Sequence, residues 1–177
     1  MTPTLVLLTG PPATGKSTLA DAAATALDAP VLGWDWAMGG LTGFEPLQAA
    51  MRGMDLPSYR SVGWSILWNL ATAQLRRGAS VVLDGVARAP EIARTRELAG
   101  TEGATVLVVA TSCADPALHR SRVEGRLRGI PGWHELTWDH VARVVAGWEP
   151  PEDADLHLDA AEPLEANVAR LVERLAT

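Results

Sequence analysis

The chain has 177 residues, of which 47% are hydrophobic, and it carries a formal net charge of −6 with a sequence pI near 5.2. This length fits one globular domain, and the acidic balance disfavours a protein that binds nucleic acid through a basic surface. We find no apolar run long enough to span a membrane, no signal peptide before Leu5, and one cysteine, Cys113, which excludes a disulfide within the chain. We therefore expect a cytoplasmic protein, monomeric or homodimeric, that has no membrane partner and for which nucleic acid is a disfavoured partner.

Strand and helix signals alternate along the chain. Short apolar runs such as Val81-Val82-Leu83 do not alternate with polar residues, which is typical of a parallel sheet covered on both faces. Helix signals are Ala- and Leu-rich stretches that begin at proline or end before glycine. The predicted strands are residues 4–9, 30–34, 80–84, 104–110 and 155–159. The predicted helices are residues 16–28, 59–77, 90–99, 116–128, 137–147 and 163–176. This order predicts a three-layer α/β fold, doubly wound, in a single domain over residues 1–177.

The segment after the first predicted strand matches the phosphate-loop pattern G-x-x-x-x-G-K-[ST] at every fixed position, as Gly10-Pro11-Pro12-Ala13-Thr14-Gly15-Lys16-Ser17. Its glycines allow positive φ and close backbone approach, so that successive N–H groups can hold an anion. Lys16 is the only lysine beside 14 arginines, and its compact ammonium fits between the β- and γ-phosphates. The predicted nucleotide-binding residues are Gly10, Ala13, Thr14, Gly15, Lys16, Ser17 and Thr18.

A second motif ends the third predicted strand. Val81-Val82-Leu83-Asp84 has the form of a Walker B strand, in which apolar residues precede a carboxylate. Ligands in open α/β sheets bind beyond the carboxyl ends of the strands, so we expect Asp84 to lie beside Ser17. A hydroxyl and a carboxylate there would bind Mg²⁺. The alternative is a strand-end aspartate that only caps a turn with Gly85.

Asp35 lies nineteen residues after Lys16, at the end of the second predicted strand. A carboxylate there can accept the proton of an acceptor hydroxyl as its oxygen attacks the γ-phosphate, so Asp35 is the candidate catalytic base. Trp34 and Trp36 flank it. The alternative is that both tryptophans belong to the core and that Asp35 caps a loop.

A cluster of basic residues falls in helix 116–128, with the members Arg120, Arg122, Arg126 and Arg128. Arg122 and Arg126 are four residues apart and would share one helix face. Together with the glycines that follow, they predict a lid over residues 116–136 that closes on the transferring phosphoryl group, with both arginines catalytic. The alternative is a solvated helix end whose charge complements the helix dipole. Which of the four arginines face the phosphates stays open.

The other side of the site is rich in tryptophan. Trp64 and Trp68, four residues apart on helix 59–77, predict a core stripe. Residues 36–58, rich in Gly and Met, predict a less regular flap on the substrate side. The candidate acceptor-binding residues are Trp34, Trp36, Arg88 and Trp133.

In this order the motifs resemble the small P-loop kinases of the chloramphenicol phosphotransferase, zeta-toxin and polynucleotide-kinase type, together with many bacterial AAA-domain ATP-binding proteins. The matching features are GPPATGKST, the two strand-end aspartates, the arginine-bearing helix after Cys113, and Leu156-His157-Leu158-Asp159. The resemblance implies a nucleoside-kinase-like sheet of five strands in the order 2-3-1-4-5, with ATP and Mg²⁺ as cosubstrates. It also implies that Asp35 is the base and that Arg122 and Arg126 are lid arginines.

One position departs from this group. Its polynucleotide and zeta-like members commonly carry an arginine shortly after the base aspartate, where this chain has Met38. The departure favours a small-molecule acceptor. We therefore predict an ATP-dependent phosphotransferase that moves the γ-phosphoryl group of ATP to a hydroxyl of a metabolite or antibiotic-like compound. The alternatives are a polynucleotide or nucleotide-sugar kinase, and a regulatory ATPase without an acceptor. The sequence does not reveal the acceptor or a preference for ATP over GTP.

Overall fold

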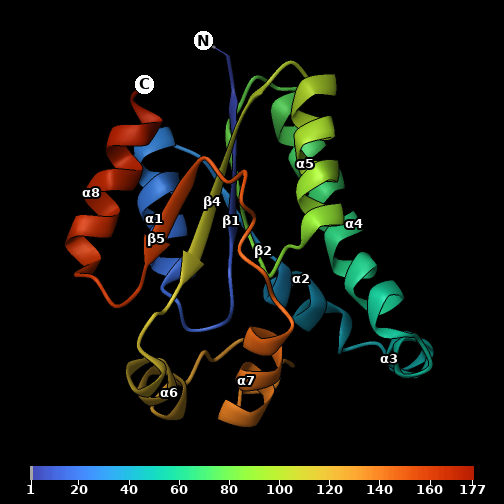
Figure 1. The fold of residues 1–177 in the computed structure, drawn as a ribbon. Coiled ribbons are helices and arrows are strands. Elements are labelled where there is room, and N and C mark those ends of the chain that lie inside the picture. The colour runs from blue at the N-terminus through green and yellow to red at the C-terminus, as the bar shows by residue number, and fades with distance from the viewer. Residues whose placement is uncertain (1) are drawn as a thin grey trace.

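The computed structural model describes residues 2–177 as an α/β fold of three layers (Figure 1). The strands are β1 (Thr4–Thr9), β2 (Val31–Gly33), β3 (Val81–Asp84), β4 (Thr105–Ser112) and β5 (Leu156–Asp159). All strand pairs are parallel, and the order β2-β3-β1-β4-β5 confirms the predicted sheet. The helices are α1 (Lys16–Leu27), α2 (Trp34–Leu41), α3 (Glu45–Arg52), α4 (Leu56–Leu75), α5 (Ala89–Thr101), α6 (Pro116–Glu124), α7 (Trp138–Ala146) and α8 (Leu164–Leu175).

Different helices bury the two faces of the sheet. Successive side chains of a strand point to opposite faces, and in β1 both sets are apolar. Leu5 and Leu7 pack in a core with residues of α4 and α5, whereas Val6 and Leu8 pack in a second core with residues of α1 and α8. Figure 1 shows α1 and α8 on one side of the sheet and α4 and α5 on the other. The non-alternating strands are therefore the sequence signature of a sheet covered on both sides.

The register of the central strands brings their carboxyl ends to one edge. Leu8, near the end of β1, pairs with Asp84 of β3, and Gly33 of β2 pairs with the same aspartate. The phosphate loop leaves β1 and α2 leaves β2 at this edge, so motifs far apart in sequence become neighbours. Figure 1 shows α6 and α7 beyond the same edge of the sheet.

Two segments differ from their predicted structure. Residues 36–58 are not irregular, because they contain most of α2, all of α3 and the start of α4. Met38 is fully buried and anchors α2, while Pro46 lies in the first turn of α3, where its missing N–H costs nothing. The predicted helix 116–128 ends at Glu124, since Gly125 follows and glycine has a poor helix propensity. None of the helices within residues 2–177 combines the length and apolar composition needed to cross a membrane.

Candidate active site

The phosphate loop is built by residues that accept unusual backbone angles. Gly10 and Gly15 have φ values of 145° and 81°, and Ala13 between them has a φ of 64°, which is uncommon for a residue with a side chain. Thr14 Oγ1 donates to the carbonyl of Pro11 at 2.8 Å and lies 2.6 Å from the hydroxyl of Thr111 in β4. The loop is thereby fixed to the sheet in a curved conformation of the kind that can hold an anion.

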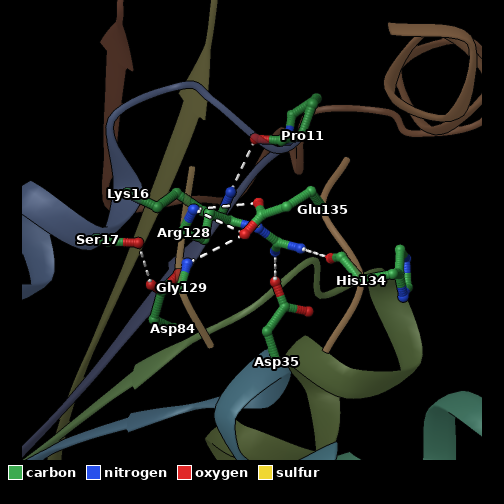
Figure 2. A network of polar contacts seen from close by, with 9 residues as sticks. All are labelled: Pro11, Lys16, Ser17, Asp35, Asp84, Arg128, Gly129, His134 and Glu135. Carbon is green, nitrogen blue, oxygen red and sulfur yellow. Dashed lines mark hydrogen bonds and ion pairs between the residues drawn. The ribbon is translucent and has the colours of Figure 1, made fainter. Parts of the chain in front are cut away.

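Lys16, which is buried, and Asp84, which is partly buried, are neighbouring opposite charges at the phosphate loop (Figure 2). Lys16 Nζ donates to the carbonyl of Pro11 at 2.8 Å, inside the loop. Burial lowers the pKa of Lys16, and the nearby Asp84 and Asp35 carboxylates oppose this shift. Burial raises the pKa of Asp84, and Lys16 and the Ser17 hydroxyl oppose it. A polyanion would compensate the lysine more fully than the two carboxylates do.

Ser17 and Asp84 are placed as the sequence predicts for a magnesium site. Ser17 Oγ donates to Asp84 Oδ2 at 2.9 Å, so a hydroxyl and a carboxylate oxygen lie together at the mouth of the loop. Both are oxygen ligands of the kind that Mg²⁺ prefers, and Mg²⁺ commonly takes one or two protein ligands plus phosphates and water. Within residues 2–177 no three His, Cys, Asp or Glu side chains gather to hold a metal by themselves. The donor set therefore fits Mg²⁺ carried by a nucleotide.

Asp35 lies in the first turn of α2, two residues beyond the end of β2, and contacts the lid segment. Arg128 Nη1 donates to Asp35 Oδ2, and Arg128 Nη2 donates to the carbonyl of His134 (Figure 2). The side chain of Arg128 is only 8% exposed, whereas that of Asp35 is 41% exposed. The carboxylate can therefore still be reached from one side while the guanidinium holds the other.

Glu135 closes the same network from the far end of the lid segment. Its carboxylate accepts from the backbone N–H of Arg128 at 3.0 Å and from that of Gly129 at 3.1 Å. These two backbone bonds hold the pKa of Glu135 below its ordinary value, and the charge of Arg128 adds to the effect. The segment after α6 is thus folded back on itself by a carboxylate, which explains why Arg128 is not helical.

The structure separates the four arginines of the cluster. Arg120 pairs with Glu124 on the exposed face of α6. Arg122 Nη1 donates to the carbonyl of Ala160 at 2.7 Å, which ties α6 to the loop after β5. Arg126 follows the end of α6, so Arg122 and Arg126 do not share a helix face as predicted. The charge of Arg126 lowers the pKa of both Lys16 and Asp84, which places it near the phosphate loop.

A cavity of about 280 Å³ adjoins the phosphate loop on the side of α8. It lies between the start of α1, the lid arginines and the loop after β5. The residues that line it are Ala13, Thr14, Gly15, Thr18, Leu19, Arg122, Arg126, Ala160, Glu162, Leu164 and Asn167. Its size approaches the lower end of the range, roughly 300–1,000 Å³, of small-molecule sites. It includes Thr18, the last residue of the predicted nucleotide set.

The opposite side of Asp35 is aromatic. Trp34 makes edge contacts with Tyr59 and Trp133, with ring centroids 5.9 and 5.8 Å apart. Trp34 Nε1 donates to the carbonyl of Arg60 at 3.1 Å, so the ring is fixed in position. Burial, with the Asp35 charge, raises the pKa of Tyr59. Among the predicted acceptor residues, Trp34 and Trp133 therefore belong to one aromatic cluster with Tyr59.

The other two predicted acceptor residues behave differently. Trp36 is 60% exposed and contributes little to this aromatic cluster. Arg88 caps the N-terminus of α5, and its backbone N–H donates to Glu91 Oε2 at 2.8 Å. Sequence reasoning missed the Arg60–Glu91 ion pair, with an N–O distance of 2.7 Å, and the role of Glu135. No local pattern marks these partners, because each depends on segments that meet only in the folded chain.

A family model described as "AAA domain" matches residues 5–151. The comparison with curated proteins gave no match. Similar solved structures include a candidate kinase of Chloroflexus aurantiacus, with a TM-score of 0.72 and 21% identity over 99% of this chain and 98% of that chain. A gluconokinase of Sinorhizobium meliloti has a TM-score of 0.67 and 20% identity over 98% and 96% of the two chains. The APS kinase of Mycobacterium tuberculosis in complex with AMPPNP and APS has a TM-score of 0.64 and 19% identity over 99% of both chains. At these identities the likeness shows a shared fold.

Proposed function

The chain belongs to the AAA domain family, and from that premise we propose that it is an ATP-dependent kinase that phosphorylates a hydroxyl group of a small molecule. The finer resemblance to the chloramphenicol phosphotransferase, zeta-toxin and polynucleotide-kinase group is part of this proposal. The similar solved structures support it, since two of them are a gluconokinase and an APS kinase, the latter in complex with AMPPNP.

One observation carries the proposal. Three groups lie together at the ends of three strands: the phosphate loop, the Ser17–Asp84 pair, and the Asp35 carboxylate bound by an arginine of the lid (Figure 2). Nucleotide binding alone would need the first of these and would benefit from the second. Nucleotide binding alone does not explain why the partly exposed Asp35 contacts Arg128 at the mouth of the same site. A base and a cation facing the phosphate loop are what phosphoryl transfer requires.

The site residues have distinct roles in this reaction. The loop amides and Lys16 would hold the β- and γ-phosphates, with the base and ribose in the cavity beside Thr18. Ser17 and Asp84 would hold Mg²⁺, which when bound supplies positive charge against the phosphate oxygens. Asp35 accepts the proton of the acceptor hydroxyl while the acceptor oxygen forms a bond to the γ-phosphorus. The bond from that phosphorus to the β–γ bridging oxygen breaks, and ADP leaves with the bonding electrons.

Arg126 and Arg128 would stabilise the charge that spreads over the transferring phosphoryl group, and Arg122 would hold the lid to the loop after β5. Residues 116–136 act as the lid and residues 36–58 as the substrate-side flap in this proposal. A small acceptor is favoured because Met38, where the polynucleotide-type members carry an arginine, is fully buried in the structure.

A coupled ADP-release assay across nucleosides, sugars, polyols, aminoglycosides and 5′-hydroxyl oligonucleotides tests the proposal. We expect one class of small acceptor to raise turnover, and Asp35→Asn to abolish that increase while ATP still quenches tryptophan emission. Asp21→Asn, at an exposed position on α1, is the matched control. If no acceptor raises turnover, or if Asp35→Asn hydrolyses ATP as fast as the unchanged protein, the chain is a regulatory ATPase instead.

A further inference from the structure

Arg88 carries a partly buried cationic side chain that has no hydrogen-bond or ion-pair partner among residues 2–177. It follows β3 by four residues and caps α5, close to the site described above. Its Nε atom is buried and has no hydrogen-bond partner. Across residues 2–177, this arginine makes hydrogen bonds only through its backbone, where its N–H donates to Glu91 and its carbonyl accepts from Ile92, and its guanidinium enters no ion pair. A buried donor left unpaired is destabilising, and more so when it is charged, so this position is suited to an acceptor from outside the chain.

Glu91, the carboxylate that caps the backbone of Arg88, is already used. Glu91 Oε1 accepts from Arg60 Nη2 at 2.7 Å, and Glu91 Oε2 accepts from the backbone N–H of Arg88 at 2.8 Å. The pKa of Arg60 is lowered by burial, and the charge of Arg88 lowers it further against the opposing effect of Glu91. The two guanidiniums therefore lie close enough to repel each other. The cluster retains one positive charge without a counterion.

This charge lies on the acceptor side of the site. The carbonyl of Arg60 accepts from the indole of Trp34, which directly precedes Asp35. On its other side Arg88 faces the segment after α7: a Cβ atom at Gly147 would lie 3.7 Å from Arg88 Nη2. Trp148 in that segment donates to the carbonyl of Ala87 at 3.0 Å. Figure 1 shows α2, α7 and the start of α5 at the same end of the sheet. Arg88 is not among the residues that line the cavity beside the phosphate loop, whereas Arg126 is.

We propose that Arg88, supported by Arg60, binds an oxyanion of the acceptor, and that the substrate of this kinase is therefore an anionic hydroxy compound. That the bound compound is a substrate rests on the proposed function, whereas the anion site itself does not depend on it. A guanidinium offers a planar fork of N–H donors that matches carboxylate or phosphate, and a charged acceptor group would satisfy the unpaired Nε. With its anionic group bound by Arg88, the acceptor would lie along Trp34 and Trp133 and present a hydroxyl group to Asp35.

The test is calorimetric titration of the protein saturated with Mg-ADP, which fills the phosphate loop and leaves the acceptor side free. The probes are polyhydroxy carboxylates, sugar phosphates, and the neutral primary amides and parent polyols that correspond to them. Arg88→Gln removes the charge and the fork, and Arg88→Lys keeps the charge alone. Arg94→Gln changes an exposed arginine of the same helix and serves as the control. Thermal melts establish that each variant is folded.

We expect at least one anionic probe to bind the unchanged protein and Arg94→Gln equally, and its neutral counterpart to bind neither. Arg88→Gln should weaken that binding about 10- to 100-fold, the loss typical of a charge-assisted hydrogen bond, and Arg88→Lys should lie between. Comparing the affinities of the carboxylate probes with those of the phosphate probes identifies which oxyanion the site binds. The inference is overturned if neutral probes bind as tightly, if Arg88→Gln binds as the unchanged protein does, or if no anion binds at millimolar concentration. If the anion binds as described but does not stimulate ADP release, the anion site stands and the kinase proposal fails.

Discussion

Gly10, the first residue of the phosphate loop, offers a prediction whose size can be worked out from the structure. Its φ of 145° lies in a region that residues with a side chain rarely adopt. A Cβ atom there would lie 2.2 Å from the carbonyl oxygen and 2.3 Å from the hydroxyl of Thr111. Thr111 is buried in β4 and its hydroxyl also contacts Thr14, so neither group can move without disturbing the sheet or the loop.

Two penalties add in Gly10→Ala. Overpacking against buried backbone costs about 1–3 kcal/mol, and a strained backbone conformation costs another 1–3 kcal/mol or so. We therefore expect a loss of roughly 4 kcal/mol, a large part of the about 5–15 kcal/mol that stabilises a typical domain. For a chain of this size that corresponds to a fall in melting temperature of about 8–16 °C.

Urea unfolding of three variants separates the two penalties. Gly78→Ala introduces a side chain at a φ of 76° with no atom within 4 Å, so it isolates backbone strain, and we expect a loss of about 1 kcal/mol. Gly43→Ala meets neither a close atom nor a positive φ, and we expect a change of less than about 0.5 kcal/mol. If Gly10→Ala loses no more free energy of unfolding than Gly78→Ala, the proposed clash with Thr111 is refuted.

Three further predictions concern the site. Arg128→Gln should lower acceptor-dependent kcat about 10²- to 10³-fold without changing the nucleotide Kd, and unchanged kcat in steady-state assays would contradict its role on the phosphoryl group. Asp84→Asn should make the affinity for ATP nearly independent of Mg²⁺, as measured by tryptophan emission with Mg²⁺ or EDTA; a retained Mg²⁺ dependence would place the metal elsewhere. Glu135 has a lowered pKa, so its contribution to stability is fully present above its ordinary value of 4.5 and is lost as pH falls through the lowered value. Urea titrations across pH should therefore show Glu135→Gln less stable than the unchanged protein near neutrality and equal to it in acid, and a constant difference would disprove the assignment.

The local sequence was sufficient for the sheet and the phosphate loop. Non-alternating apolar strands predicted a sheet buried on both faces, and the strand–loop–helix context of Lys16 predicted how the loop would meet a nucleotide. Ser17 and Asp84 could be paired in advance because parallel strands share one carboxyl edge. In each case the signal is short-range, or it follows from a general property of α/β sheets.

The structure of the lid and of the acceptor side could not be predicted from the sequence, because it depends on long-range contacts that leave no periodic pattern. Helical spacing suggested that Arg122 and Arg126 act together, but the helix stops at Gly125 and the Glu135 carboxylate refolds the following segment. Residues 36–58 contain helices because α2 buries Met38 against the rest of the domain, which composition alone did not indicate. Arg88 lacks a counterion because Glu91 forms its ion pair with Arg60, a contact that joins α4 to α5 and has no local sequence signal.

The sequence by itself thus determined the P-loop domain and predicted its phosphate-binding lysine, its serine–aspartate pair for a metal and its candidate base, because these follow from strand order and from motifs within a few residues of strand ends. Only the tertiary structure decided which arginine meets Asp35 and which cation is left without a counterion. The physical reason is that burial and partner choice depend on long-range contacts, such as that between Asp35 and Arg128.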